Sequence, residues 1–97
     1  MATVKLTERA HQDLERIFEF IASQDPARAL GIIENIEDAV QVLARHPLIG
    51  RLVEDGRREL VVSRGRNTYV ALYRWFDAEE FALVLAIRSA REAGYAD

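Results

Sequence analysis

The chain has 97 residues, 49% of them hydrophobic, which fits a single domain spanning residues 1–97 with one core. Its formal net charge of −3 argues against a general coat for DNA or RNA and against attachment to an anionic membrane, and the absence of cysteine excludes disulfides, thiolate nucleophiles and zinc–sulfur sites. No apolar run approaches the roughly 20 residues of a membrane span and no signal peptide is recognisable, so we expect a soluble cytoplasmic protein.

The N-terminal residues predict a short edge strand that runs directly into a helix. Residues 4–6 alternate between apolar and polar side chains, and Thr7 is a typical helix N-cap. Apolar residues then recur at helical spacing through residues 10–21, with Asp13 among the polar side chains around the rest of the helix. We expect this helix to end near Ala22 or Ser23.

A second helix is predicted to begin at Asp25-Pro26, because Asp caps free amides and Pro suits the first helical position. Its apolar stripe continues to His46, where Pro47 stops it. The short connection between the two helices predicts an antiparallel hairpin. Gly31 lies inside the second helix at a cost of about 1 kcal/mol relative to Ala, so we expect another element to approach closely there.

After Pro47 the periodicity changes from helix to strand. Residues 59–63 predict a short strand, residues 69–75 alternate, and residues 81–87 are nearly all apolar, which is typical of a central strand. Turn residues separate these segments. The predicted fold class is α+β with the order β-α-α-β-β-β, in which an N-terminal helical hairpin packs on one face of a small antiparallel sheet.

Arginines gather in the second half of the chain. Residues 51–74 contain six arginines and three acidic residues, whereas residues 7–46 contain four basic and eight acidic residues. Arginine binds phosphate and carboxylate groups bidentately, so this pattern favours a target-binding surface. Its candidate residues are Arg58, Arg64, Arg66, Arg88, Arg91 and Tyr95.

The alternative is that these arginines form exposed ion pairs worth at most about 1 kcal/mol each. The acidic partners would then be Glu54, Asp55, Glu59 and Glu92.

No motif predicts a metal ion or a cofactor. His11 and His46 suit surface or capping roles, and the sequence has neither paired-histidine spacing nor a glycine-rich phosphate loop. The acidic residues of the predicted second helix lie off its apolar stripe, as solvated surface charges do. We therefore expect no cofactor and no metal site.

Several short motifs follow one another in a specific order along almost the whole chain. They are Asp25-Pro26, His46-Pro47-Leu48-Ile49-Gly50-Arg51, Arg58-Glu59-Leu60-Val61-Val62, Tyr69-Val70-Ala71-Leu72-Tyr73-Arg74, Leu85-Ala86-Ile87-Arg88 and Arg91-Glu92-Ala93-Gly94-Tyr95. Together they resemble the RelE/ParE superfamily, the toxins of type II toxin–antitoxin modules, also called plasmid stabilisation proteins. The resemblance implies the same fold of a helical hairpin on a small antiparallel sheet.

The resemblance implies one of two activities. RelE-like members cleave messenger RNA in the ribosomal A site, whereas ParE-like members inhibit DNA gyrase and are not known to depend on a hydrolytic site. This chain is closer to ParE, because it lacks the lysines that RelE-type enzymes place before and within the second strand, its total charge is negative, and Ser89 stands where many relatives carry a histidine. A non-enzymatic gyrase inhibitor is the first hypothesis.

A ribosome-dependent mRNA endoribonuclease is the alternative, with no catalytic residue assigned firmly. In that case arginines would stabilise charge on the scissile phosphate while a tyrosine moved a proton. The residues that match this pattern are Arg64, Arg66, Arg91 and Tyr95. A third possibility is a scaffold that has lost its toxicity.

The resemblance also implies a cognate antitoxin whose disordered or helical C-terminal part folds across the toxin to form a hetero-oligomer. Phe20, Leu30 and Val42 fall off the main apolar stripes of the two predicted helices. Such side chains are unfavourable on a free surface, so we expect them to bind the antitoxin.

Overall fold

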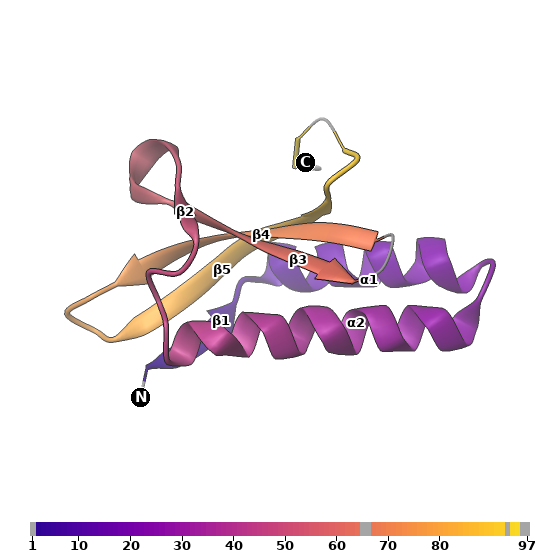
Figure 1. Ribbon diagram of the computed structural model, residues 1–97, viewed down its shortest axis with the longest axis horizontal. Coiled ribbons are helices and arrows are strands. Elements are labelled where there is room, and N and C mark those ends of the chain that lie inside the picture. The colour runs from indigo at the N-terminus through magenta and orange to yellow at the C-terminus, as the bar shows by residue number, and fades with distance from the viewer. Residues whose placement is uncertain (1, 65–66, 93, 96–97) are drawn as a thin grey trace.

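The computed structural model describes residues 2–64, 67–92 and 94–95 of the chain, without the side chains of residues 63 and 64. Its elements in chain order are β1 (Thr3–Leu6), α1 (Glu8–Ala22), α2 (Pro26–Gln41), the 3₁₀ turn η1 (Val42–Ala44), β2 (Arg51–Leu52), the turn η2 (Glu54–Gly56), β3 (Arg58–Arg64), β4 (Asn67–Phe76) and β5 (Phe81–Ser89). The two helices cover one face of the sheet, and the described end of the chain, at residues 94–95, lies on the other side of it (Figure 1). The predicted α+β fold with an N-terminal helical hairpin is confirmed.

The sheet is mixed, which corrects the prediction of a wholly antiparallel sheet. Its strand order is β1-β5-β4-β3-β2, and β3, β4 and β5 form the predicted antiparallel meander. β1, however, pairs in parallel with β5, from Thr3 opposite Phe81 to Leu6 opposite Val84. The two-residue strand β2, which was not predicted, pairs with β3 at the opposite edge.

The capping residues act as the sequence predicts. The Thr7 side chain accepts a hydrogen bond from the Ala10 amide, and the Asp25 side chain accepts one from the Arg28 amide at the start of α2. α2 ends at Gln41, and η1 continues the chain for one turn instead of a helix reaching His46. The expectation of a close approach at Gly31 is wrong, since a Cβ atom at this exposed position would have no neighbour within 4 Å.

The core lies between the helices and the sheet, and one carboxylate is buried in it. Asp13, expected on the polar side of α1, is only 5% exposed. Its Oδ2 atom accepts a hydrogen bond of 2.9 Å from the Ile87 amide, and the Thr7 hydroxyl donates to the Leu85 carbonyl. The reason is that β1 ends opposite Val84, so the remaining edge of β5 needs partners from α1 and its cap.

Candidate functional site

The register of the strands decides which charged side chains lie on the face of the sheet away from the helices, here called the open face. Tyr73 and Ala71 of β4 pack in the core beneath the helices. Because successive side chains alternate, Leu72 points to the open face, as do its partner Glu59 on β3 and, on β5, Arg88. The sheet therefore brings a glutamate and an arginine, both half-buried, to one surface.

Glu59 is the centre of a polar group on the open face, the Glu59 cluster, formed by Arg51, Glu59, Arg88 and Tyr95. The Tyr95 hydroxyl donates a hydrogen bond of 2.7 Å to Oε2 of Glu59, and Arg51 donates one of 2.9 Å to Oε1. The Arg88 guanidinium lies 3.9 Å from the same carboxylate and 5.1 Å from the centre of the Tyr95 ring. The side chains of Arg88 and Glu59 are only 19% and 13% exposed, so this pair is not the exposed ion pair of the alternative hypothesis, whereas Arg51 is 78% exposed.

The contacts in the Glu59 cluster shift the pKa values of its two acidic groups in opposite directions. Burial and the hydrogen bond to Glu59 raise the pKa of Tyr95 to about 12. The hydrogen bond from Tyr95, helped by Arg51 and Arg88, lowers the pKa of Glu59 against the opposing effect of its own burial. At neutral pH the cluster therefore holds a protonated phenol that donates to an ionised carboxylate.

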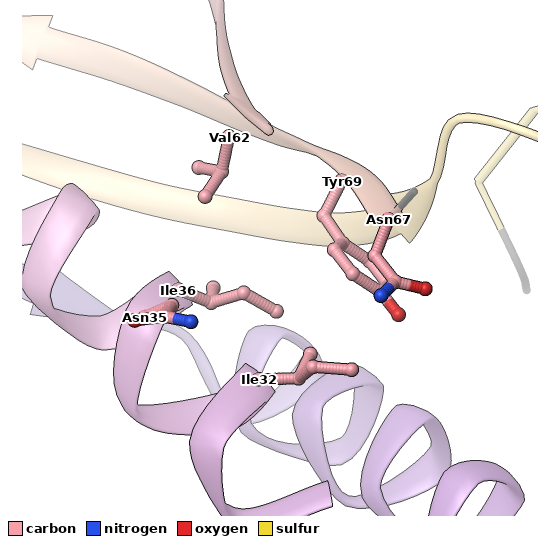
Figure 2. Close-up of a pocket in the computed structure, with 6 residues that line it drawn as sticks. All are labelled: Ile32, Asn35, Ile36, Val62, Asn67 and Tyr69. Carbon is pink, nitrogen blue, oxygen red and sulfur yellow. The ribbon is translucent and has the colours of Figure 1, made fainter. Parts of the chain in front are cut away.

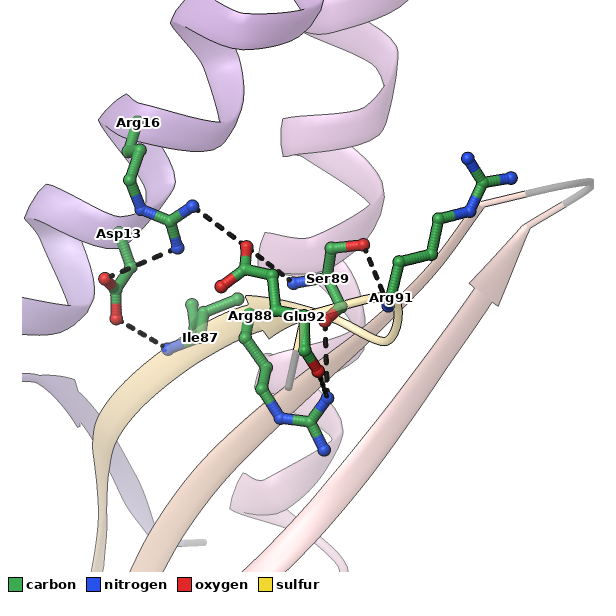
Figure 3. A network of polar contacts seen from close by, with 7 residues as sticks. All are labelled: Asp13, Arg16, Ile87, Arg88, Ser89, Arg91 and Glu92. Atoms are coloured by element: carbon green, nitrogen blue, oxygen red, sulfur yellow. Dashed lines mark hydrogen bonds and ion pairs between the residues drawn. The ribbon is translucent and has the colours of Figure 1, made fainter. Parts of the chain in front are cut away.

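A second network fastens the beginning of the C-terminal tail (residues 89–95) to α1 (Figure 3). Arg16 donates a hydrogen bond of 2.9 Å to Oε1 of Glu92, and its other terminal nitrogen lies 3.8 Å from the buried Asp13. Figure 3 shows the Arg91 guanidinium pointing away from this network, while its amide donates to the Ser89 hydroxyl. The tail is thus held at Glu92 by a helix and at Tyr95 by a strand.

Arg58 lies on the other face of the sheet from the Glu59 cluster. Its Nη1 atom donates to the carbonyl oxygens of Leu48, at 3.2 Å, and Gly50, at 2.9 Å. The Tyr73 hydroxyl holds the same loop, donating to the Pro47 carbonyl and accepting from the Gly50 amide. A Cβ atom on Gly50 would lie 2.6 Å from the Tyr73 ring, which explains the glycine in this motif.

The remaining arginine candidates fall into two groups. Arg91 is exposed on the tail. Arg66 and the Arg64 side chain lie outside the part of the chain that the structure describes. The structure therefore brings Arg88 and Tyr95 together, and places Arg58 and Arg91 apart from that pair.

The residues expected to bind an antitoxin are all exposed, and two of them lie far apart. Phe20, Leu30 and Val42 are 75%, 57% and 40% exposed. Leu30 and Val42 are twelve positions apart, which in a helix is about 18 Å along the axis and about 120° around it. Their role in binding stays a prediction. Phe20 also lines a groove.

That groove lies between the C-terminal half of α1 and the end of the sheet where β4 begins and β5 ends, and its volume is about 850 Å³. A much smaller hollow, of about 10 Å³, lies between α2 and the strands β3 and β4 (Figure 2). The hollow has room for about one water molecule, so it does not suit a ligand. The groove is the only one of the two that is large enough for side chains of a partner.

Some features of the surface were not predicted from the sequence. Exposed aliphatic side chains occur on the loop before β2, on β2 itself and on the open face, namely Leu48, Ile49, Leu52 and Val61. The central position of Glu59 was also missed, although alternation along 58–62 places it opposite to Arg58 across the sheet. Within residues 2–64, 67–92 and 94–95, no group of three or more metal-binding side chains is close enough to hold a metal ion. No helix in the described residues has the length and apolar character needed to cross a membrane.

Comparisons with known proteins identify the family. Residues 4–94 match the family model of the ParE toxin of the type II toxin–antitoxin system parDE. Two toxins of Caulobacter vibrioides, RelE3 and RelE1, are 35% and 32% identical to this chain over 76% and 74% of its length, which is 80% and 77% of theirs.

Solved structures agree with this result. The structure of the chromosomal ParDE system from P. aeruginosa matches 92% of this chain and 96% of its own with a TM-score of 0.76 and 26% identity. The toxin–antitoxin complex RelBE of E. coli shows the same fold with a TM-score of 0.68 at 13% identity, covering 95% of this chain and all of that one. The chain therefore belongs to the ParE toxin family, within the RelE/ParE superfamily of type II toxin–antitoxin toxins.

Proposed function

We propose that this chain is a ParE-like toxin that inhibits DNA gyrase without hydrolytic chemistry, and that a cognate antitoxin neutralises it. The observation that favours gyrase inhibition over RNA cleavage is the hydrogen bonding and protonation of Tyr95. Its hydroxyl is engaged with the Glu59 carboxylate, and its pKa of about 12 keeps the phenol protonated at neutral pH. A general base should have a pKa near the working pH, so Tyr95 is poorly suited to take a proton from an RNA hydroxyl.

The neighbouring residues support the same choice. Ser89, which stands where many relatives carry a histidine, accepts a hydrogen bond from the Arg91 amide and offers no group that titrates near pH 7. Arg88 and Tyr95, in contrast, are residue types that are common at binding hot spots. The proposed target-binding surface therefore centres on Arg88 and Tyr95, with Arg91, Arg58, Arg64 and Arg66 as further candidates.

The test is gyrase supercoiling with the purified toxin. We expect the protein to inhibit supercoiling of relaxed plasmid and to induce a DNA-damage response in cells. Arg88→Ala and Arg91→Ala should weaken inhibition, whereas Arg45→Ala, an exposed arginine just after η1, should not. Full supercoiling at a high excess of wild-type protein would refute the proposal.

Ribosome-dependent cleavage of messenger RNA is the second candidate, because the two Caulobacter relatives are named RelE toxins. In this case Arg64, Arg66 and Arg91 would stabilise charge on the phosphate, with Tyr95 as the candidate for proton transfer. Mapping transcript ends after induction separates the two functions. Cuts at the ribosomal A site together with normal gyrase activity would favour the nuclease, and intact transcripts would exclude it.

A cognate antitoxin as partner is supported by the structural neighbours, two of which are toxin–antitoxin complexes. We infer that the cognate antitoxin binds the helical hairpin, with Phe20, Leu30 and Val42 as candidate contacts. Variants Phe20→Asp, Leu30→Asp and Val42→Asp that fold normally and bind the antitoxin with wild-type affinity would contradict this assignment.

A further inference from the structure

The C-terminal tail is attached to the body of the protein at Glu92 and at Tyr95. Glu92 accepts a hydrogen bond of 2.9 Å from Arg16 of α1, and the Tyr95 hydroxyl donates one of 2.7 Å to Glu59 of β3. The extended chain from Glu92 to Tyr95 spans about 10 Å. Loss of the contact with Glu59 therefore allows the Tyr95 side chain to move by a distance of this order, while the anchor at Glu92 stays in place.

The guanidinium group of Arg88 depends on the same tail. Its Nη1 atom donates to the carbonyl oxygens of Ser89, at 3.3 Å, and Glu92, at 3.4 Å (Figure 3). The guanidinium carbon lies 5.1 Å from the centre of the Tyr95 ring, a distance that allows a cation–π contact. The orientation of Arg88 is therefore set by the position of the tail, and of Tyr95 in particular.

Glu59 is the fixed member of this group. It lies in β3 between two paired strands, opposite Arg51 of β2 and Leu72 of β4. Its side chain is 13% exposed, so it offers little surface to a partner protein. The hydrogen bond from Tyr95 is the main cause of its lowered pKa, so the carboxylate is ionised at neutral pH. Such a charge-assisted hydrogen bond is about twice as strong as one between neutral groups.

We propose that Glu59 is a positioning residue for target binding, which holds Tyr95 and, through it, Arg88 in the orientation that meets the target. The inference rests on the proposed function, because it takes Arg88 and Tyr95 as target-binding residues. A tail that is already ordered avoids the cost of immobilising its side chains on binding, which is about tenfold in affinity.

The competing role for Glu59 is to mask the arginines of the cluster from an acidic target. One carboxylate does not neutralise two guanidinium groups, and Arg51 remains 78% exposed beside it. Positioning therefore explains the contacts better than masking does. The two roles also predict opposite results, since removal of Glu59 weakens target binding in the first case and strengthens it in the second.

Glu59→Ala and Glu59→Gln test the positioning role. The toxin concentration that half-inhibits supercoiling by gyrase is measured for wild type, both variants, Tyr95→Phe and the double variant of Glu59→Ala with Tyr95→Phe. We expect Glu59→Ala to raise this concentration about tenfold. Glu59→Gln should raise it by less than about threefold, because the amide oxygen still accepts a hydrogen bond from Tyr95. The double variant should be no weaker than Glu59→Ala, since both changes break the same link.

The matched control is Tyr73→Phe, which loses hydrogen bonds to a loop away from the open face. It should leave inhibition unchanged although it lowers stability. Relaxation of the Gly94 amide, measured by nuclear magnetic resonance, reports the order of the tail without any target. We expect greater mobility of Gly94 in Glu59→Ala than in wild type or Glu59→Gln.

Three results would overturn the inference. They are inhibition by folded Glu59→Ala at or above the wild-type level, independent effects of Glu59→Ala and Tyr95→Phe that multiply in the double variant, and equal mobility of Gly94 in wild type and Glu59→Ala. The last result counts whichever target is correct. A wild-type toxin that leaves gyrase unaffected refutes the proposed function instead. Growth arrest on induction then replaces gyrase inhibition as the measure, with the same order of potency expected among the variants.

Discussion

The two faces of the sheet are built on different physical principles. On the helix face, side chains such as Tyr73 and Ile87 are completely buried, and the apolar surface removed from water supplies the stability. On the open face Val61 is 61% exposed, and the Glu59 cluster is held by polar contacts. The comparison teaches that the alternation of the strands separates apolar packing on one face from polar contacts on the other, so substitutions on the two faces should have different effects on stability.

The largest difference is expected for apolar truncations. Ile87→Ala leaves a cavity under the helices and should lower the free energy of unfolding by about 2–5 kcal/mol. Val61→Ala removes an exposed side chain from the open face and should change it by less than about 0.5 kcal/mol. Urea unfolding followed by circular dichroism measures both. Equal losses for the two variants would show that the open face is covered in solution.

The next largest effect is expected at Asp13, which joins α1 to the free edge of β5. Asp13→Ala leaves the buried Ile87 amide without its acceptor and should cost about 1–3 kcal/mol. Asp13→Asn keeps an acceptor oxygen and should cost less. Hydrogen exchange of the Ile87 amide reports the local effect, and equally fast exchange in both variants and in the wild type would contradict the role of this hydrogen bond.

A third effect on stability concerns the loop of residues 47–50, which the Tyr73 hydroxyl holds through two hydrogen bonds. Tyr73→Phe removes the hydroxyl that accepts from the buried Gly50 amide and donates to the Pro47 carbonyl. We expect a loss of about 1–2 kcal/mol in unfolding free energy. Antitoxin affinity and toxicity should not change, because the hydroxyl lies away from the open face and the groove. A variant that kept full stability but lost toxicity would place this loop in the functional surface.

Much of the fold could be predicted from local chemistry. Thr7 and Asp25 are the predicted caps, and their side chains accept hydrogen bonds from the Ala10 and Arg28 amides. The apolar stripes of the helices locate the core. The parallel partner of β1 could not be predicted, because alternation identifies a strand without naming its neighbour. For the same reason Asp13 looked like a surface acid, although its hydrogen-bond partner is 74 positions away in the sequence.

The candidate site was predictable only in part. Counting arginines located the cationic region, but Arg58 and Arg88 are used on opposite faces, one to hold a loop and the other beside Glu59 and Tyr95. Alternation along β3 already places Arg58 and Glu59 on opposite faces, so this difference could have been predicted from the sequence. The groove could not be predicted, because Arg28 and Arg91 come from distant segments of the sequence. The start of β4 and the end of β5 bring them to the same groove.

The smallest effect on stability is expected at Tyr95, the residue through which the C-terminal tail contacts the open face. Tyr95→Phe removes one partly exposed hydrogen bond and should cost less than about 1 kcal/mol at pH 7. It should also raise the pKa of Glu59, since the Tyr95 hydroxyl is the main cause of its lowering. A side-chain titration by nuclear magnetic resonance measures this shift.

The pH dependence of this difference distinguishes a real contact from a general loss of packing. Folding raises the pKa of Tyr95 from 10.0 to about 12, so the stability it contributes is complete below pH 10 and is lost as the pH rises towards 12. The lowered pKa of Glu59 contributes stability above its usual pKa of 4.5 that is lost as the pH falls through the lowered value. The difference in unfolding free energy between wild type and Tyr95→Phe should therefore be constant at neutral pH and shrink at both extremes. Tyr69 and Tyr73 titrate in both proteins and cancel in this difference, so a gap that stayed constant to pH 12 would show that the Tyr95 hydroxyl does not donate to Glu59 in solution.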